Sequence, residues 1–388
     1  MEKQTEYDAV TTFNVMDFGA VGDGSKDDTK AITDAWNSAC GNGGTPTILF
    51  PDAKKFLLNP IEFDVEGQIV APSRGGRWAN CASQWIAFTN IIGLTIRGNG
   101  LIDGQGEAYW SRKVNQVEDD SQDDEDVYYR EFDALRFESC NNVTINYVNT
   151  KDTPGVHFSI KSCNDVEISN VKISAPADSP NTDGINIVAS KRVTIRDSTI
   201  RTGDDCIAIN SGSQFFNVTN VACEPGHGIS IGSLGKENYD TVEDIHVKNC
   251  SFTETQNGAR IKTYQGGRGY ARRITFEGIT LTDASNPIFI DQKYCPHNAC
   301  GQRQGHICDT QTSYLDAITL DCAEGKGCTD IILDDVNIWT ADSSKPARSV
   351  CNNAHGRATR TEPKVPCLGR IAAPFVWSEN SMNIPTFD

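Results

Sequence analysis

Apolar residues recur along most of the chain in short alternating runs of a few positions each. Such runs occupy 47–50, 56–58, 68–70, 86–88 and 94–96, and Gly, Pro, Asn or Asp stands between most of them. A period of two indicates strands with one buried face, and the intervening residues favour turns. Apart from one stretch near the N-terminus, no long segment before residue 340 has a helical period, so the pattern predicts an all-β chain.

The spacing of the runs becomes nearly regular from residue 138. The segment 139–145 (SCNNVTI) recurs 23 positions later as 162–168 (SCNDVEI). Further alternating apolar pairs follow at offsets of 27, 23, 29 and 29 residues, and they begin at Val193, Phe216, Ile245 and Ile274. A sandwich does not need such regularity, whereas a solenoid does, because each coil buries its face only against its neighbours. The sequence therefore predicts a right-handed parallel β-helix.

The two ends of the chain depart from the repeat. A first strand is expected at 13–15, and Ser25 with Asp28 resembles the capping box of a helix. A helical stripe follows and ends near Gly41, and its members are Ala31, Ile32, Ala35, Trp36 and Ala39. We expect this helix to cover the open end of the first coil. One domain, 1–388, is predicted, with strand and capping helix at 13–41, coils at 45–340 and an irregular tail at 341–388.

Composition and charge exclude several classes of function and partner. The chain has 388 residues, 38% of them hydrophobic, and no apolar run of about 18 residues that would span a membrane. A net charge of −17 disfavours nucleic acid and anionic membranes as partners. Part of the negative charge lies at 117–126, which we expect to be a solvated loop.

The cysteines favour an oxidising compartment. There are 14 of them without a paired C-x2-C zinc framework. Close spacing makes three disulfides plausible, although connectivity stays open, and these are Cys206–Cys223, Cys322–Cys328 and Cys351–Cys367. Cys140 and Cys163, which fall at equivalent positions of the repeat, are expected to be packed interior residues.

Signals for secretion are mixed. Sequons for N-glycosylation begin at Asn142, Asn217 and Asn249. The N-terminus lacks the apolar core of a signal peptide, so the protein is either cytosolic or a secreted protein whose signal has been removed. The cysteines favour the second interpretation. We therefore expect a secreted, extracellular or cell-wall glycoprotein.

Four polar phrases in the middle of the chain carry the candidate chemistry. Asp183 and Asp205 are 22 residues apart, and His227 follows Asp205 by another 22. If each interval is one coil, the three side chains stack with a separation of about 4.8 Å, the strand spacing. Asp204 stands beside Asp205. The fourth phrase, at 258–262, contributes Arg260 and Lys262, which should face outward because Ile261 between them faces inward.

Stacked carboxylates suit the hydrolysis of a glycosidic bond, which needs one protonated and one ionised carboxyl group. At about 5 Å and an effective dielectric near 20, two carboxylates repel by about 3 kcal/mol, enough to keep a proton on one of them at mildly acidic pH. A single Asp-Gly would be read as a turn. Like charges in register favour a functional site, and nearby cations could offset that charge or bind an anionic ligand.

Taken together, the phrases resemble the signatures of the plant-type polygalacturonase family of glycoside hydrolases. They are Asn181-Thr182-Asp183, Gly203-Asp204-Asp205, Gly226-His227-Gly228 and Arg260-Ile261-Lys262. The resemblance implies hydrolysis of α-1,4 galacturonosyl links of pectin with inversion and without a metal or cofactor. It implies that Asp204 is the general acid and that Asp183 and Asp205 activate water.

By the same resemblance, other residues surround the scissile bond. His227 would belong to the catalytic set, through the acid or a sugar hydroxyl. Asn181, Arg260, Lys262 and Tyr294 would bind substrate, and Cys206–Cys223 would be a disulfide beside the site. We expect endo action on an anionic polysaccharide by a monomer, with proteinaceous inhibitors as a second candidate partner.

Several rival functions remain open at this point. Within the family they are an exo-polygalacturonase and a rhamnogalacturonan hydrolase. Outside it they are a Ca²⁺-dependent pectate lyase, in which the carboxylates would hold the ion, and a non-catalytic β-helix that binds polysaccharide.

Overall fold

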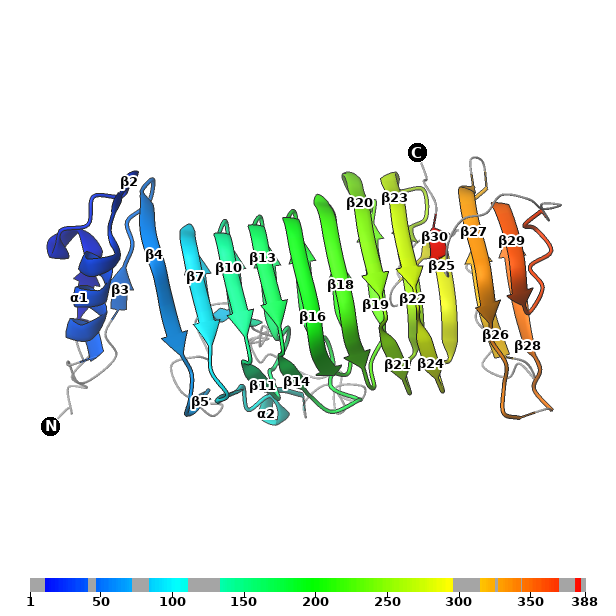
Figure 1. Ribbon diagram of the computed structural model, residues 1–388, viewed down its shortest axis with the longest axis horizontal. Helices are drawn as coiled ribbons and strands as arrows, with labels where there is room; N and C mark the ends of the chain where they lie inside the picture. Colours follow the sequence, from blue (N-terminus) through cyan, green and yellow to red (C-terminus); the bar gives the residue numbers. More distant parts are fainter. Residues whose placement is uncertain are drawn as a thin grey trace, which may run out of the picture.

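The computed structural model describes residues 11–40, 47–71, 84–110, 133–295, 315–324, 327–342, 344–369 and 381–384. These residues form a right-handed parallel β-helix, in which strands from successive coils lie side by side along one axis (Figure 1). The acidic segment 117–126 lies outside the described residues. Among the residues described, no helix is long and apolar enough to cross a membrane.

One wall of the solenoid is a ten-stranded sheet. Its strands are parallel and pair in the order of the coils. They are β6 (Gln84–Thr89), β9 (Asp133–Glu138), β12 (Phe158–Lys161), β15 (Ile185–Val188), β17 (Ile207–Ile209), β19 (Ile229–Leu234), β22 (Asn257–Tyr264), β25 (Asn286–Tyr294), β26 (Leu315–Asp321) and β28 (Ala347–Asn352).

The remaining walls belong to an 18-stranded sheet. Its longer strands cross the front of Figure 1. They are β4 (Lys55–Asp64), β7 (Ile91–Arg97), β10 (Asn141–Asn146), β13 (Asn164–Ser169), β16 (Lys191–Arg201), β18 (Ser213–Cys223), β20 (Tyr239–Lys248), β23 (Arg268–Glu277), β27 (Cys328–Asn337) and β29 (Ala354–Glu362). Short strands continue several coils, and these are β5 (Gln68–Val70), β8 (Leu101–Asp103), β11 (Asn149–Lys151), β14 (Lys172–Ser174), β21 (Ser251–Thr253) and β24 (Thr280–Thr282). A four-residue helix, α2 (Glu107–Trp110), follows β8.

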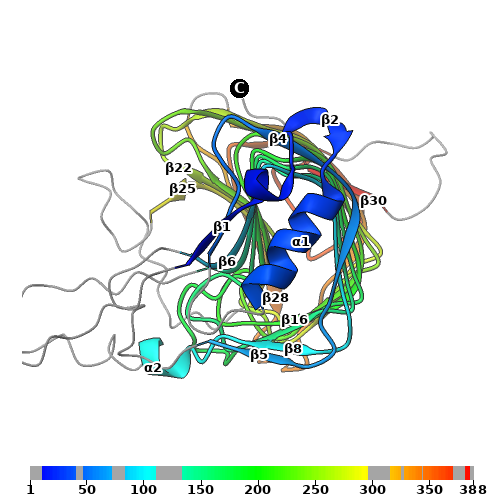
Figure 2. The ribbon, with the colours of Figure 1, turned by 90° about the vertical axis from the view of Figure 1, so that its left-hand side faces the viewer.

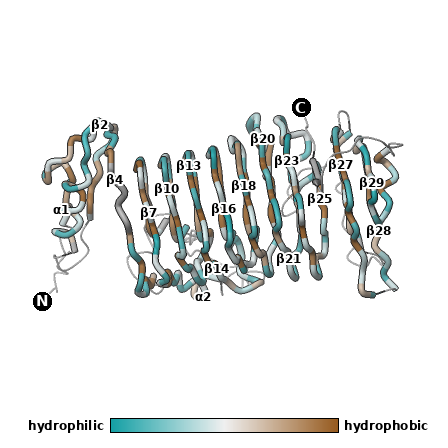
Figure 3. Tube along the Cα trace, viewed as in Figure 1, coloured by the Kyte–Doolittle hydropathy of each residue, from teal (hydrophilic) through white to brown (hydrophobic). Residues whose placement is uncertain are grey.

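The core consists of apolar ladders that run along the solenoid axis. The predicted pairs fall in one register, in which Val143 is aligned with Val166, Val193, Phe216, Ile245 and Ile274 in turn. All six side chains are buried. Within each strand the neighbouring polar residues face outward, so hydropathy alternates along the strand (Figure 3). Cys140 and Cys163 are buried free thiols, as predicted.

The N-terminal segment covers the end of the first coil. Strand β1 (Thr12–Asn14) pairs with β3 (Thr47–Leu49), and the 3₁₀ helix η1 (Val15–Phe18) follows β1. The predicted helix is α1 (Thr29–Cys40), which lies across the interior when the solenoid is viewed end-on (Figure 2). Its small apolar residues and Ile32 are buried, but Trp36 remains 45% exposed, with its edge against Phe63.

The predicted capping box is wrong. Ser25 lies inside β2 (Asp23–Asp27), and the buried Asp28 carboxylate instead accepts backbone N–H groups of Val21 and Gly22 at 2.7 and 3.0 Å. The pattern failed because the Asp28 carboxylate is used to close the Gly-rich turn before the helix.

The predicted irregular tail at 341–388 also needs correction. Strands β28 and β29 form a further coil, and β30 (Ser381–Ile384) pairs antiparallel with β23. Pro346 directly precedes β28 and Pro363 directly follows β29, so these prolines mark strand ends rather than irregular chain.

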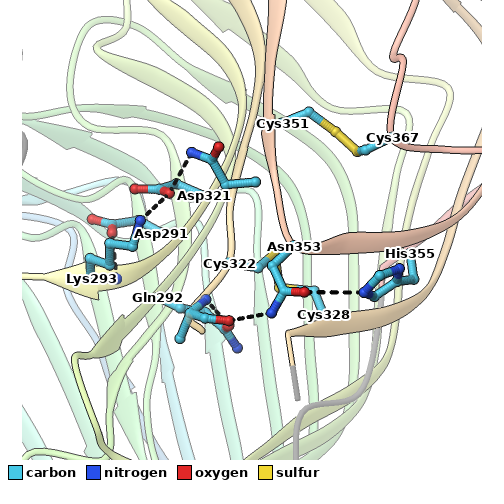
Figure 4. Close-up of a disulfide and its surroundings, with 12 residues drawn as sticks. Asp291, Gln292, Lys293, Asp321, Cys322, Cys328, Cys351, Asn353, His355 and Cys367 are labelled. Atoms are coloured by element: carbon cyan, nitrogen blue, oxygen red, sulfur yellow. Dashed lines mark hydrogen bonds and ion pairs between the residues drawn. A yellow bond between two sulfur atoms is a disulfide. The ribbon is translucent and has the colours of Figure 1, made fainter. Parts of the chain in front are cut away.

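The three plausible disulfides are all formed. Two of them staple this C-terminal region, Cys322–Cys328 and Cys351–Cys367 (Figure 4). The third, Cys206–Cys223, joins the residue after Asp205 to the end of β18, with the Cα atoms 5.8 Å apart. It therefore ties together the two ends of the coil that carries the acidic pair.

Candidate active site

The turns before β15, β17 and β19 bring the predicted acidic residues together. Ile185, Ile207 and Ile229 are aligned partners in these strands, so Asp183, Asp205 and His227, each two positions earlier, also follow one another along the axis. Backbone bonds hold the turns in this register: Gly184 N–H donates to the Asp205 carbonyl at 2.9 Å, and His227 N–H donates to the Asp204 carbonyl at 2.8 Å. The 22-residue spacing is therefore one coil of the solenoid.

Two glycines let these turns approach their neighbours. A Cβ atom on Gly203 would lie 2.0 Å from the Ser179 carbonyl oxygen, so a side chain there is incompatible with the stacking. Gly228 adopts φ +83° and would clash with the Asn257 carbonyl. Glycine at these positions thus follows from coil packing, independently of the chemistry of Asp204 and His227.

Asp205 is a buried, fully engaged carboxylate. Its side chain is 3% exposed, and Lys262 Nζ lies 2.7 Å from Oδ2. The Ser230 hydroxyl, also buried, donates to Oδ1 at 2.6 Å. Both carboxylate oxygens of Asp205 are therefore engaged by side chains of neighbouring coils.

Asp204 forms a pair with His227. His227 Nδ1 lies 2.9 Å from Asp204 Oδ1, and the same oxygen accepts the Asp205 N–H at 2.8 Å. Burial acts to raise the pKa of Asp204, but the hydrogen bond and charge of His227 outweigh it, and the pKa of Asp204 lies below its ordinary value. The contact with His227 thus favours the carboxylate form of Asp204.

Asp183 is the carboxyl group that retains a proton. Burial raises its pKa well above the ordinary value, and the charges of Asp205 and Asp204 add to the effect. Asn186 Nδ2 donates to Asp183 Oδ2 at 2.7 Å, and Asn210 Nδ2 in turn donates to Asn186 Oδ1 at 3.2 Å. Mutual repulsion was expected to leave a proton in the cluster, and the structure places it on Asp183 rather than on Asp204.

The cations and Tyr294 flank the carboxylates along the same wall. Lys262 Nζ and Arg260 Cζ lie 5.5 and 5.6 Å from the centre of the Tyr294 ring. Arg260 Nε is buried and has no hydrogen-bond partner among the described residues. Asn181, two positions before Asp183, is exposed. All eight predicted site residues thus lie on the turns and strands of five consecutive coils.

A calcium ion does not suit this cluster. Single atoms of Asp204, Asp205 and His227 lie within 4.8 Å of one another, close enough to be considered as ligands. Ca²⁺ requires six to eight oxygen ligands, however, and here one donor is an imidazole nitrogen. The Lys262 ammonium already occupies Asp205 Oδ2. The donor set thus disagrees with the calcium site that a lyase would need.

Ser230 and Asn186 were not predicted. Ser230 lies in the phrase that contains His227, between Ile229 and Ile231, and strand alternation alone places it on the outer face with Asp205. Asn186 alternates with Ile185 and Ile187 in the same way. The sequence therefore marked both residues, since each is a polar residue between two isoleucines that face the core.

A solenoid whose outer wall carries stacked carboxylates, an imidazole and two cations defines a β-helical carbohydrate-processing enzyme. Residues 40–361 match the model of the glycosyl hydrolases family 28, and the chain belongs to this family. It is a glycoside hydrolase of the polygalacturonase type.

Similar proteins agree with this assignment. A probable polygalacturonase of Arabidopsis thaliana is 41% identical over 387 residues, which cover 92% of this chain and 81% of that protein. An exopolygalacturonase of Zea mays is 35% identical over 92% of this chain and 90% of its own length. The structure resembles an endo-xylogalacturonan hydrolase from Aspergillus tubingensis, with a TM-score of 0.59 and 28% identity over 91% and 92% of the two chains.

Proposed function

We propose that the protein is an endo-polygalacturonase that hydrolyses α-1,4 galacturonosyl links of pectin by an inverting acid–base mechanism. One observation carries the proposal: Asp204, whose pKa His227 lowers, lies in the same stack of turns as Asp183, whose pKa burial raises, and as Asp205, which contacts Lys262. Inverting hydrolysis needs an acid and a base that differ in protonation, and this stack separates identical side chains into different states.

The acid is the Asp204–His227 pair acting as a unit. Both hydrogen bonds to Asp204 use Oδ1, so Oδ2 is the oxygen that would meet the leaving group. The lowered pKa of Asp204 makes its protonated form a minor but strongly acidic one. As the glycosidic bond breaks, that form passes its proton to the leaving oxygen, and the hydrogen bond from His227 stabilises the carboxylate that remains.

Water is activated by Asp183 and Asp205. Asp205, held by Lys262 and Ser230, positions the water molecule, whereas Asp183 must first lose its proton before it can accept one from water. Catalysis therefore needs Asp183 ionised and Asp204 protonated at the same time, so the rate should rise and then fall with pH in a bell-shaped profile.

The charges beside the carboxylates favour an acidic sugar. The buried Arg260 Nε lacks a hydrogen-bond partner among the described residues, and Lys262 lies on the same face. A galacturonate carboxylate would give the guanidinium a partner, and a sugar ring could pack on Tyr294. Asn181, exposed at the edge of the stack, would contact the same substrate.

Endo action is supported by the place of the site within the sheet. The ten-stranded sheet continues through β12, β9 and β6 on one side of the site and through β26 and β28 on the other. Among the described residues, the wall on which a polymer would lie thus extends past the site in both directions. Polygalacturonate should give a ladder of oligomers at early times, whereas monomer alone would establish exo action and refute endo cleavage.

The same assay separates the other rivals. Hydrolysis should yield reducing ends, continue in the presence of a chelator and give no unsaturated product absorbing in the ultraviolet. A chelator-sensitive, absorbing product would mean a lyase, and binding without turnover would mean a carbohydrate-binding solenoid. Faster cleavage of a rhamnogalacturonan backbone than of polygalacturonate would mean that the enzyme is a rhamnogalacturonan hydrolase. We further propose that the enzyme is secreted to the cell wall, in keeping with its disulfides.

A further inference from the structure

A groove lies on the outer face of the 18-stranded sheet, away from the proposed active site. Its volume is about 400 Å³, and it runs across β10, β13, β16 and β18, which lie side by side in the middle of Figure 1. Residues that line it include Asn142, Asp165, Arg192, Thr194, Phe215 and Asn217. Three strand spacings of about 4.8 Å separate the first and last of these strands, so the groove is roughly 14 Å long.

The groove contains an exposed aromatic ring that the mechanism does not use. Phe215 is 50% exposed although its neighbour Phe216 is fully buried in the core. Single exposed apolar side chains are common on protein surfaces, so what distinguishes Phe215 is its position in a polar groove. The surrounding side chains are polar or charged, and Arg192 is held by Asp165 in a bidentate ion pair at 2.6 and 2.9 Å. An aromatic ring within a polar trough is the usual setting for a sugar rather than for an apolar ligand.

A sequon begins two residues after this ring. Asn217, Val218 and Thr219 form the acceptor triplet N-x-T. Asn217 is exposed and lines the same groove as Phe215, on the opposite side of the buried Phe216. A sugar attached to the Asn217 amide would therefore begin its path next to the exposed ring.

We propose that Asn217 carries an N-linked glycan whose first sugar packs on Phe215 and whose following sugars lie in the groove. In the transfer, Asn217 Nδ2 forms a bond to the anomeric carbon of a lipid-linked oligosaccharide. The bond from that carbon to the lipid diphosphate breaks, the diphosphate leaves with the electron pair, and the amide gives one proton to a base of the transferase. The inference depends on secretion but not on the proposed hydrolytic chemistry.

The other sequons supply internal comparisons. Asn142 is exposed at the far end of the same groove, but the residue two positions before it is the buried Cys140. Asn249 is also exposed, and the residue two positions before it is Val247, which is buried in the core. Neither offers an aromatic ring to its first sugar from the equivalent position, so a stabilising effect should be specific to Asn217.

The test uses the full chain secreted from a eukaryotic host, with peptide mass analysis to establish occupancy at each sequon. An endoglycosidase trims glycans to one sugar, and a glycoamidase removes them and leaves Asp. We expect occupied Asn217, a melting temperature that is nearly retained after trimming, and a loss of several degrees after complete removal. The unglycosylated Asn217→Asp variant controls for the new charge.

Phe215→Ala decides whether the ring is responsible. In this variant, complete removal of the glycan should change the melting temperature far less than in the parent, while Asn249→Gln should leave the parental difference unchanged. Activity towards polygalacturonate should be the same in all forms, because the groove and the catalytic wall belong to different sheets. An unmodified Asn217 peptide, or an equal loss with and without Phe215, would overturn the proposal.

Discussion

Two columns of charged residues on this solenoid are built by the same register and behave in opposite ways. On the outer sheet, Asp165 is paired with Arg192 of the next coil at 2.6 Å, and two coils further on Asp244 is paired with Arg273 at 2.6 Å. At the proposed active site, Asp183 is followed by Asp205 of the next coil, with the single ammonium of Lys262 beside Asp205.

The pKa values of the carboxyl groups record this difference. The hydrogen bond and charge of Arg192 lower the pKa of Asp165, whereas burial and two like charges raise the pKa of Asp183 well above its ordinary value. In both columns the register of the coils places side chains from successive coils next to one another. Alternating signs make a column that is electrostatically satisfied, and repeated negative charge makes one that can hold and release a proton.

The largest expected difference between the columns concerns catalysis. Asp204→Asn preserves the shape of the side chain but removes its exchangeable proton, and general acid catalysis typically contributes about 10²- to 10⁴-fold. We expect kcat on polygalacturonate, measured by release of reducing ends, to fall by that factor with unchanged melting. Asp165→Asn is the matched control and should stay close to the parent. A kcat for Asp204→Asn within a few-fold of the parent would refute the acid role.

A second difference concerns stability at neutral pH. Lys262→Met removes the partner of the buried Asp205, and an unpaired buried charge typically costs about 3–5 kcal/mol of unfolding free energy. Urea denaturation at pH 7 should show this loss. Arg192→Met, at the solvent-exposed pair, should cause a much smaller change. Equal losses for the two variants would show that burial does not distinguish the columns.

The hydroxyl group of Ser230 should have an intermediate effect. Ser230→Ala removes a buried hydrogen bond to an ionised carboxylate, worth about 1.5–3 kcal/mol of unfolding free energy. It should also lower kcat, because the bond orients the carboxylate that positions water. Ser230→Thr keeps the hydroxyl and should restore kcat; a kcat unchanged by Ser230→Ala would mean that the bond has only a structural role.

The smallest effect is expected in the pH dependence of stability. Because the folded-state pKa of Asp183 is raised, its stabilising contribution is present below the ordinary value of 3.8 and is lost as pH rises through the folded-state pKa. The urea midpoint of the parent should therefore fall as pH rises, and Asp183→Asn should make this fall smaller. Asp165 has a lowered pKa, so its contribution is present above 3.8 and lost as pH falls. Finding the same sign for both residues would contradict the comparison.

Most of the solenoid could be predicted because its signal is local. Val143, Val166 and Val193 stand between polar neighbours, and strand alternation is enough to place them inside. The same logic brought Asp183, Asp205 and His227 into one column. Strand β29 was missed because its outward positions are polar and its coil is bounded by prolines, so few apolar pairs marked it.

The protonation states could not be predicted from spacing. Repulsion among stacked carboxylates indicates that a proton is retained, but the residue that retains it depends on burial and on Lys262, which lies 57 positions from Asp205. The prediction that Asp28 belongs to a capping box was wrong for a similar reason, because the partners of Asp28 are the N–H groups of a preceding turn. Sequence patterns thus predicted which side chains meet, and three-dimensional surroundings decided their charge.

The long separation between Asp205 and Lys262 also has a consequence during synthesis. A growing chain that has placed the acidic turns still lacks the ammonium until two more coils have emerged and folded onto them. Over that interval the nascent protein carries the acidic turns without the ammonium that contacts Asp205. The cluster should therefore reach its final charge balance only when the coil containing β22 docks.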